Sequence, residues 1–420
     1  MYALIVPLLL LAPPGPDAAP DVDDAVRSDA RLADVCFVDV EYGWAVGDRG
    51  TIWHTADSGR HWQIQSSGVV CPLESVCFLD RQTGWAAGAV GHPYLHTGAG
   101  ILLATSDGGS HWQSAASHPL PPLKKIRFLD GRRGWAIGSP TAMYPSGVLT
   151  TDSGGRNWTP LPGATLGQWL TGDCLGPTMG VLAGRRGMAA TLQRNSIEPA
   201  RNSPFGIRNL TRLRLVAPPH GWLIGDGGLV LLTGDLSATW QPPAGELPAG
   251  MAQQFDFQAL AVRGPKCWIA GTPGTRIFHT PDAGRNWLAF TTGVSTPLDG
   301  LWFVDDHRGW AVGALGTILA TLDGGRTWQR QRAGGARAAL LALVARPEDI
   351  PLELFARLSG NEGFLGVAEV LTRQDVELAA DTQLHPADRM REAVTAVGAS
   401  DARVAWRFPL RQAGLELDVR

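Results

Sequence analysis

Short apolar runs alternate with clusters of Gly, Asp and Ser along most of this chain. In the first unit of the pattern the runs are 35–38, 43–47, 51–55 and 62–65, and the third run alternates apolar with polar positions. Turn-forming residues separate all four runs. Runs of this length and spacing predict four short strands joined by tight turns.

The second run of the unit recurs along the chain as near-copies of Gly-Trp-Ala-Val-Gly. Their tryptophans are Trp44, Trp85, Trp135, Trp222, Trp268 and Trp310. The interval between Trp135 and Trp222 is 87 residues (222 − 135), about twice the others, which predicts a further copy that has lost its tryptophan. Residues 180–187 carry that copy, with Val181 in the Trp position. Seven units with a period of about 40–50 residues predict an all-β, seven-bladed β-propeller with four-stranded antiparallel blades.

A second motif lies between the third and fourth predicted strands. It begins at Asp57, Asp107, Asp282 and Asp323, each two residues after a Thr, and it ends in a Trp. The Asp can accept hydrogen bonds from its own turn and Gly supplies a positive φ, so the motif predicts a structural hairpin turn. In the third unit Asp152 is the candidate, with the motif one residue longer, unless Ser153 takes the Asp role.

Asp boxes paired with Gly-Trp strands resemble the photosystem II stability and assembly factors, which are seven-bladed lumenal propellers, and their bacterial relatives. The resemblance covers residues 26–335. It implies a non-enzymatic protein that needs no cofactor and binds a protein or peptide partner, such as a membrane-protein complex. The same repeat also builds sialidases, so a sialidase-like glycoside hydrolase is an alternative. That chemistry needs a Tyr with a Glu beside it, and none of the four Tyr residues lies in a strand beside a Glu.

The first residues of the chain predict export. Residues 1–12 are apolar but too few to cross a bilayer, and small residues follow at Ala18 and Ala19, so we interpret 1–19 as a signal peptide. The mature protein is then secreted, periplasmic or lumenal and has no stable membrane span. A net charge of −3 without a basic block argues against nucleic acid as a partner.

Residues 336–420 follow a different pattern, in which strands alternate with helical stretches, and they predict a small α/β segment. Its beginning resembles the zinc-dependent PIG-L de-N-acetylases, which makes such an enzyme with a propeller accessory domain a second alternative. The resemblance implies that Arg346 stands in place of a zinc-binding His, Glu348 in place of the base, and Asp349 as the remaining ligand. Because Arg cannot ligate zinc, we expect a truncated, non-catalytic segment without a metal.

Loop lengths indicate where a partner binds. From the Gly-Trp strand to the following Thr there are 11 residues in the first unit (55 − 44) but 20 and 16 in the next two (105 − 85 and 151 − 135). These enlarged loops lie on the rim opposite the Asp boxes, and loops on a rigid scaffold commonly carry binding. The candidate binding residues in the loops are His92, Tyr94, Met143 and Tyr144. Arg49 and Arg186 are two further candidates, because each lies five residues after the Trp position of its unit (49 − 44 and 186 − 181).

Overall fold

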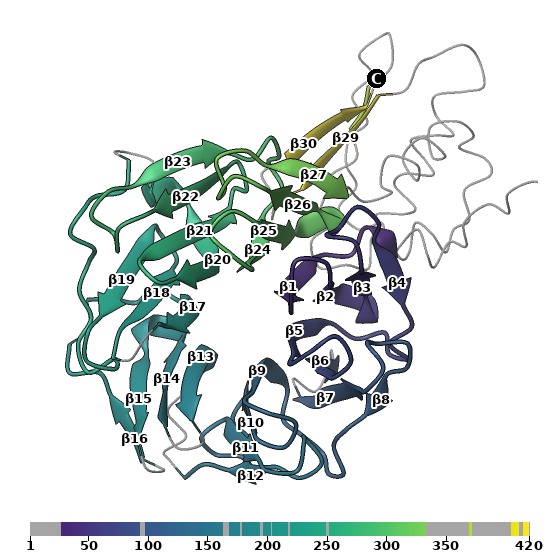
Figure 1. Ribbon diagram of the computed structural model, residues 1–420, viewed down its shortest axis with the longest axis vertical. Helices are drawn as coiled ribbons and strands as arrows, with labels where there is room; N and C mark the ends of the chain where they lie inside the picture. Colours follow the sequence, from purple (N-terminus) through teal and green to yellow (C-terminus); the bar gives the residue numbers. More distant parts are fainter. Residues whose placement is uncertain are drawn as a thin grey trace, which may run out of the picture.

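The computed structural model describes most of residues 27–332 and three short strands beyond them. The residues outside the description are 1–26, 93–96, 163–167, 177–178, 194–195, 203, 217–218, 249–251, 333–368, 372–404, 411–414 and 420. The predicted signal peptide and Arg346, Glu348 and Asp349 therefore lie outside the described residues. Seven antiparallel sheets stand around a common centre and form the predicted seven-bladed propeller (Figure 1).

Each blade is built from consecutive strands, and its first strand lies nearest the ring centre. In the first three blades the strands are β1 (Leu32–Phe37), β2 (Gly43–Gly47), β3 (Ile52–Thr55) and β4 (Gln63–Gln65); β5 (Leu73–Phe78), β6 (Gly84–His92), β7 (Thr97–Thr105) and β8 (Gln113–Ser114); and β9 (Leu123–Phe128), β10 (Gly134–Gly138), β11 (Val148–Thr151) and β12 (Thr159–Pro160). In the last four they are β13 (Trp169–Gly176), β14 (Met179–Gly184), β15 (Ala189–Gln193) and β16 (Ser196–Pro199); β17 (Leu210–Leu215), β18 (Gly221–Gly225) and β19 (Leu229–Thr233); β20 (Asp256–Arg263), β21 (Lys266–Thr272), β22 (Arg276–Thr280) and β23 (Leu288–Thr291); and β24 (Leu298–Phe303), β25 (Gly309–Gly313), β26 (Ile318–Thr321) and β27 (Gln329–Arg332).

The blade that lost its tryptophan is fully formed, as predicted. Its four strands pair in the order β13-β14-β15-β16, and Val181 is completely buried within β14. In the fifth blade a single bridge between Leu232 and Gln241 takes the place of a fourth strand.

Beyond the propeller, three strands are described: β28 (Glu369–Leu371), β29 (Ala405–Leu410) and β30 (Leu415–Val419). They pair antiparallel in the order β28-β29-β30. The remainder of the predicted α/β segment lies outside the described residues.

Stacked aromatic rings join neighbouring blades. Trp44 of blade 1 stacks on Phe78 of blade 2 with ring centroids 3.6 Å apart, and its indole Nε1 donates to the carbonyl of Gly108 at 3.0 Å. The same stack occurs in the pairs Trp85–Phe128, Trp268–Phe303 and Trp310–Phe37. The last pair joins blade 7 to blade 1, which share no sheet, and the N–H of Gly316 also donates to the carbonyl of Ala30 across this junction. Each stack contributes about 0.5–1.5 kcal/mol beyond the area that it buries.

The Asp boxes are compact hydrogen-bonded turns, as the sequence predicts. In the first box the Thr55 hydroxyl donates to Asp57 Oδ1 at 2.9 Å, and the backbone N–H groups of Gly59 and His61 donate to Thr55 Oγ1 and Asp57 Oδ1. The boxes of Asp107, Asp235, Asp282 and Asp323 repeat these bonds.

The assignment of Asp152 to the third box is wrong. Ser153 takes the Asp position, because its hydroxyl lies 3.3 Å from Thr151 Oγ1 and accepts the N–H of Asn157 at 3.0 Å. Asp152 is one residue too early to reach these groups. Its side chain is exposed, and its backbone carbonyl accepts a hydrogen bond from Arg132.

Two rims of the ring are distinguished by backbone hydrogen bonds. On one rim, the turns after the second strands meet the blade-to-blade connections, as where Gly50 N–H donates to the carbonyl of Cys71. On the other, the Asp boxes meet the first turn of the same blade, as where Ser58 N–H donates to the carbonyl of Glu41. We call these the loop rim and the Asp-box rim.

Candidate functional site

The ring centre carries charged side chains that the repeat does not require. β9 contributes Lys125 and Arg127, and β17 contributes Arg212 and Arg214. In most other blades the equivalent positions of the first strand carry small or uncharged residues, for example Ser75 and Gly300. Blades 3 and 5 are therefore the source of the positive charge.

Several of these side chains reach blades that are not their neighbours. Lys125 Nζ of blade 3 lies 2.6 Å from Asp34 Oδ2 of blade 1. Arg212 of blade 5 donates to the carbonyls of Ala33 in blade 1 and Asp299 in blade 7, at 3.2 and 3.1 Å. Contacts between such distant blades place the charged groups at the ring axis.

The Lys125–Asp34 pair is largely buried. Burial alone would raise the pKa of Asp34, but the positive charges of Lys125 and Arg212 outweigh it and lower that pKa. The Asp34 carboxylate also accepts hydrogen bonds from the Ser75 hydroxyl and the Val76 N–H. Asp34 is therefore a charged carboxylate with most of its acceptor sites occupied.

The four cations exceed the carboxylates among them. Asp34 and Asp173 supply two negative charges against four positive ones, which leaves an excess of two (4 − 2). Arg127 Nε lies 3.2 Å from Asp173 Oδ1, whereas Arg214 has no ion pair or side-chain hydrogen bond with any described residue. The Arg214 guanidinium lies 5.9 Å from the ring centroid of Trp302 instead. From beyond ion-pair distance, its positive charge helps to lower the pKa of Asp34.

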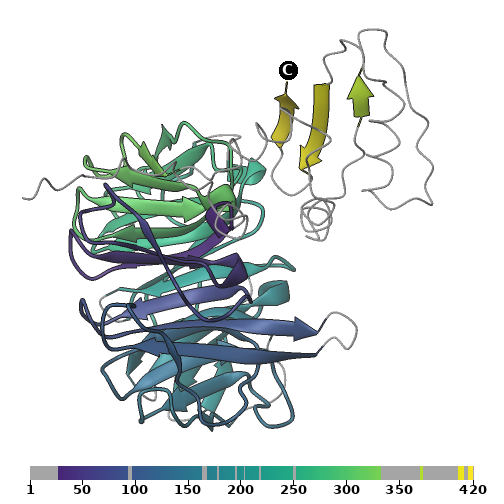
Figure 2. The ribbon, with the colours of Figure 1, turned by 90° about the vertical axis from the view of Figure 1, so that its right-hand side faces the viewer.

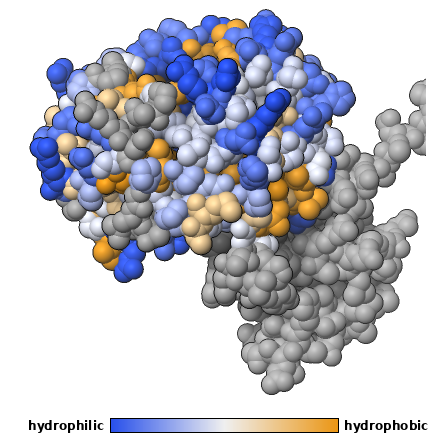
Figure 3. Space-filling view, turned by 90° about the horizontal axis from the view of Figure 1, so that it is seen from below, coloured by the Kyte–Doolittle hydropathy of each residue, from blue (hydrophilic) through white to orange (hydrophobic). Residues whose placement is uncertain are grey.

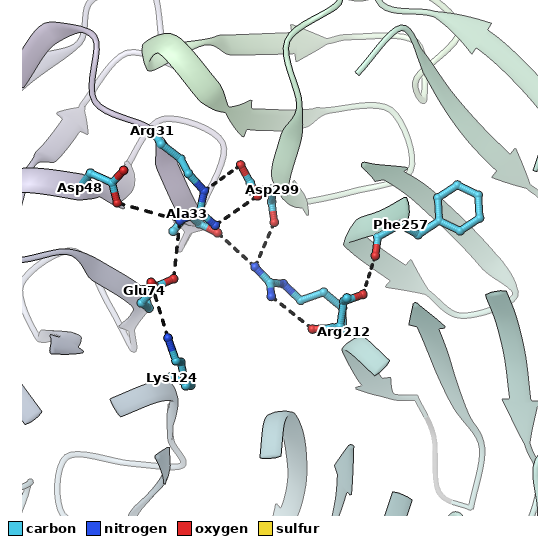
Figure 4. Close-up of polar contacts among 9 residues, drawn as sticks. Arg31, Ala33, Asp48, Glu74, Lys124, Arg212, Phe257 and Asp299 are labelled. Atoms are coloured by element: carbon cyan, nitrogen blue, oxygen red, sulfur yellow. Dashed lines mark hydrogen bonds and ion pairs between the residues drawn. The ribbon is translucent and has the colours of Figure 1, made fainter. Parts of the chain in front are cut away.

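A second charged cluster lies where the first strands begin, at the loop-rim end of the ring centre (Figure 4). Arg31 donates to both carboxylate oxygens of Asp299 at 3.2 and 3.1 Å and lies within 4.0 Å of Asp48 and Glu74. Burial acts to lower the pKa of Arg31, but Asp299 and Glu74 outweigh it and raise that pKa. Lys124 lies 3.9 Å from Glu74 and is partly exposed.

Arg49 and Arg186 occupy equivalent turns on the loop rim, as predicted from their shared offset. Both have left-handed backbones, with φ values of 59° and 56°, in the short helical turns η1 (Asp48–Gly50) and η2 (Arg185–Gly187). They belong to blades 1 and 4 and are not neighbours. Arg186 is exposed, and Gly187 N–H donates to the carbonyl of Arg208, which is also exposed.

The enlarged loops differ from each other. The loop of blade 2 extends the β6–β7 hairpin, so His92 ends a strand; Tyr94 lies outside the described residues. In blade 3, Met143 is 62% exposed, but Tyr144 is only 5% exposed and its hydroxyl donates to the carbonyl of Pro119. Tyr144, one of the candidate binding residues, therefore offers a partner almost no exposed surface, because its ring packs into the core between blades 2 and 3.

Sequence reasoning missed the cations of the ring centre. Their signal is present when the first strands are aligned, because β9 (Leu-Lys-Lys-Ile-Arg-Phe) and β17 (Leu-Thr-Arg-Leu-Arg-Leu) carry cations that β1 (Leu-Ala-Asp-Val-Cys-Phe) lacks.

The described residues contain no group of three or more His, Cys, Asp or Glu side chains that could hold a metal ion. No helix in this part of the chain has the length and apolar character that a membrane crossing needs.

Comparison with known proteins identifies similar sequences. The profile of the family described as "Photosynthesis system II assembly factor YCF48" matches residues 207–301. The photosystem II assembly lipoprotein Ycf48 of Synechococcus sp. (strain CC9902) is 30% identical over 116 residues, which are 27% of this chain and 33% of that protein. The photosystem II stability/assembly factor HCF136 of Arabidopsis thaliana is 28% identical over 116 residues, 27% of this chain and 28% of that protein. The matches thus span about a third of the length of these relatives or less.

Solved structures agree with the fold. A structure titled "YCF48 bound to D1 peptide" has a TM-score of 0.56 at 24% identity and covers 70% of this chain and 92% of its own. YCF48 from Cyanidioschyzon merolae has a TM-score of 0.55 at 18% identity and covers 70% and 96%. At this identity the likeness establishes the fold alone. The chain is a seven-bladed β-propeller similar to the photosystem II assembly factors, with its sequence likeness to the family profile concentrated in the fifth and sixth blades.

Proposed function

We propose that this chain is an exported, non-enzymatic β-propeller that binds a protein or peptide partner in the manner of a photosystem II assembly factor. The relatives with similar sequences carry the name of assembly factors, and one structure of the same fold carries a D1 peptide. A membrane-protein complex is the class of partner that these likenesses suggest.

The excess of cations over carboxylates in the group formed by Lys125, Arg127, Arg212 and Arg214 with Asp34 and Asp173 carries this proposal. Burying charge is unfavourable, and most other first strands of this ring fill the same positions with small or uncharged residues, so folding does not require Lys125, Arg127, Arg212 and Arg214 there. Arg127 and Arg214 remain partly exposed. Positive groups without enough carboxylates favour an acidic segment or a terminal carboxylate of the partner.

The loop rim is the proposed contact surface around this centre. Arg49, His92, Met143 and Arg186 lie on it in four consecutive blades. The cluster of Arg31, Glu74 and Lys124 lies at the end of the ring centre on the same side. The edge of the ring seen in Figure 3 carries separate apolar patches among hydrophilic residues. The larger departures from the repeat are the enlarged loops of blades 2 and 3, which lie on the loop rim.

Affinity capture from the source organism tests the proposal. Arg214→Gln removes a charge without leaving a carboxylate unpaired, so the fold should persist while capture of the partner falls about tenfold. Arg330→Gln is the matched control, because Arg330 is exposed on the outermost strand β27. Equal capture by wild type and Arg214→Gln would exclude the ring centre from binding, and absence of a captured protein would contradict the function itself.

A further inference from the structure

The hairpin of blade 2 projects beyond its own sheet. β6 and β7 pair along their whole length, from Gly84 with Thr105 to His92 with Thr97. β5 pairs with β6 only as far as the partners Leu73 and Gly88. The last residues of β6 therefore have β7 as a strand neighbour on one side and no strand on the other, and the hairpin stands out from the ring in Figure 2.

Backbone groups on this outer side of β6 point away from β7. Ala89 N–H donates to the carbonyl of Pro72 at 3.2 Å, which fixes the side toward which residue 89 directs its polar groups. Because antiparallel strands alternate, Gly91 directs its N–H and C=O to the same side. No described residue hydrogen-bonds to Gly91 there, and a Cβ built on Gly91 meets nothing within 4 Å. We call the segment from Ala89 to Gly91 the β6 edge.

The opposite edge of the hairpin is closed. On the β7 side, Gly100 N–H donates to the carbonyl of Leu120 at 2.8 Å. A Cβ on Gly98 would lie 2.9 Å from Pro122 Cγ, so the connection between blades 2 and 3 packs directly against β7. Pro121 and Pro122 lack an N–H, which prevents further pairing. Residues 89–91 carry neither proline nor charge, the usual protections of an exposed strand edge, and the first proline after them in the sequence is Pro93.

Apolar and basic side chains border the β6 edge. Val90 within it is 48% exposed, and Val70 in the connection that leads to Pro72 is 81% exposed. The neighbouring carbonyl of Cys71 accepts the N–H of Gly50, which brings the turn of Arg49 to the same connection. Val90 thus belongs to the edge itself, whereas Val70 and Arg49 belong to the connection and the turn beside it.

We propose that the β6 edge receives an extended segment of the partner protein as an additional β-strand. Gly91 supplies the main-chain N–H and C=O, and the carbonyl of Ala89 supplies a second acceptor, as in other cases of strand addition. Val70 and Val90 contact apolar side chains of the segment, and Arg49 pairs with an acidic one. This inference rests on the proposed function and names the way in which the partner binds.

The test compares two substitutions at one position. Gly91→Pro removes the outward N–H, and because this N–H does not point toward β7, the substitution removes no hydrogen bond of the β6–β7 ladder. Gly91→Ala keeps the N–H and enters open space. Short random peptides displayed on phage are selected on the full-length wild-type protein, and the enriched peptides are synthesised as probes.

Loss of the added-strand hydrogen bonds should weaken probe binding to Gly91→Pro about tenfold or more, whereas Gly91→Ala should stay within about twofold of wild type. In the wild-type protein, amide exchange at Gly91 should slow on binding. Probes that bind Gly91→Pro as well as wild type, with unchanged exchange at Gly91, would refute the edge and leave peptide binding standing. Failure to enrich any peptide would overturn both proposals, and a wild-type dimer abolished by Gly91→Pro would assign the edge to a second copy of the chain.

Discussion

Two tryptophans in equivalent positions allow one hydrogen bond to be isolated from the packing around it. Trp44 and Trp310 are both at most 2% exposed and both stack on a Phe with centroids 3.6 Å apart. They differ in the indole N–H. Trp44 Nε1 donates to the carbonyl of Gly108 at 3.0 Å, whereas the buried Nε1 of Trp310 has no partner among the described residues.

Replacing each tryptophan by Phe should therefore have unequal effects. Both variants lose similar buried area and leave a similar cavity. Trp44→Phe also loses a hydrogen bond with a net value of about 0.5–1.5 kcal/mol, but it leaves no orphaned carbonyl, because Gln65 Nε2 still donates to Gly108 O at 2.9 Å. Trp310→Phe removes an unsatisfied buried N–H whose desolvation costs about 1–3 kcal/mol. The two terms add, so Trp44→Phe should be more destabilising by about 1.5–4.5 kcal/mol.

The measurement is guanidinium unfolding followed by far-UV circular dichroism, because many other tryptophans would obscure fluorescence. Equal slopes of the free energy of unfolding against denaturant are needed before midpoints are compared. Trp85→Phe is the control and should resemble Trp44→Phe, since Trp85 Nε1 donates to Gly154 O at 3.0 Å. An equal cost for Trp44→Phe and Trp310→Phe, or a larger cost for the latter, would refute the reasoning.

Two further predictions concern charged groups. The backbone N–H and side chain of His111, with the Thr105 hydroxyl, lower the pKa of Asp107 to about 2, below the usual value of about 3.9 in an unfolded chain. The stability that this carboxylate contributes is thus present above about pH 4 and is lost as the pH falls toward 2. Asp107→Asn should therefore flatten the dependence of the unfolding free energy on pH between these values. Asp152→Asn is the control, because Asp152 lies outside the box, and it should leave that dependence unchanged. Lys125→Met leaves the buried Asp34 without its partner and should cost about 3–5 kcal/mol in denaturant unfolding. A cost below about 0.5 kcal/mol, or no recovery when Asp34→Asn is added, would mean that the pair is not coupled.

The sequence alone determined the blades, because each depends on local patterns. The Gly-Trp period located all seven units, including the one around Val181, and the Thr-Asp pairs located the hairpin turns. Both motifs act within a few residues of chain, where side-chain type and turn geometry are sufficient. The sequence does not distinguish Asp152 from Ser153 in the third box, because the two lie one residue apart. The structure does, since only the hydroxyl of Ser153 reaches both Thr151 and Asn157.

Tertiary structure decided the burial of loop side chains and the chemistry of the ring centre. Tyr144 lies in an enlarged loop with many turn residues, and only the approach of blade 2 shows that its ring is buried. Arg31 and Asp299 are 268 residues apart and meet because the ring closes. Lys125 and Arg212 find their partners across the axis for the same reason. Periodicity places a residue within its blade, but it does not say which side chains of other blades lie opposite, so contacts at the centre follow from ring closure alone.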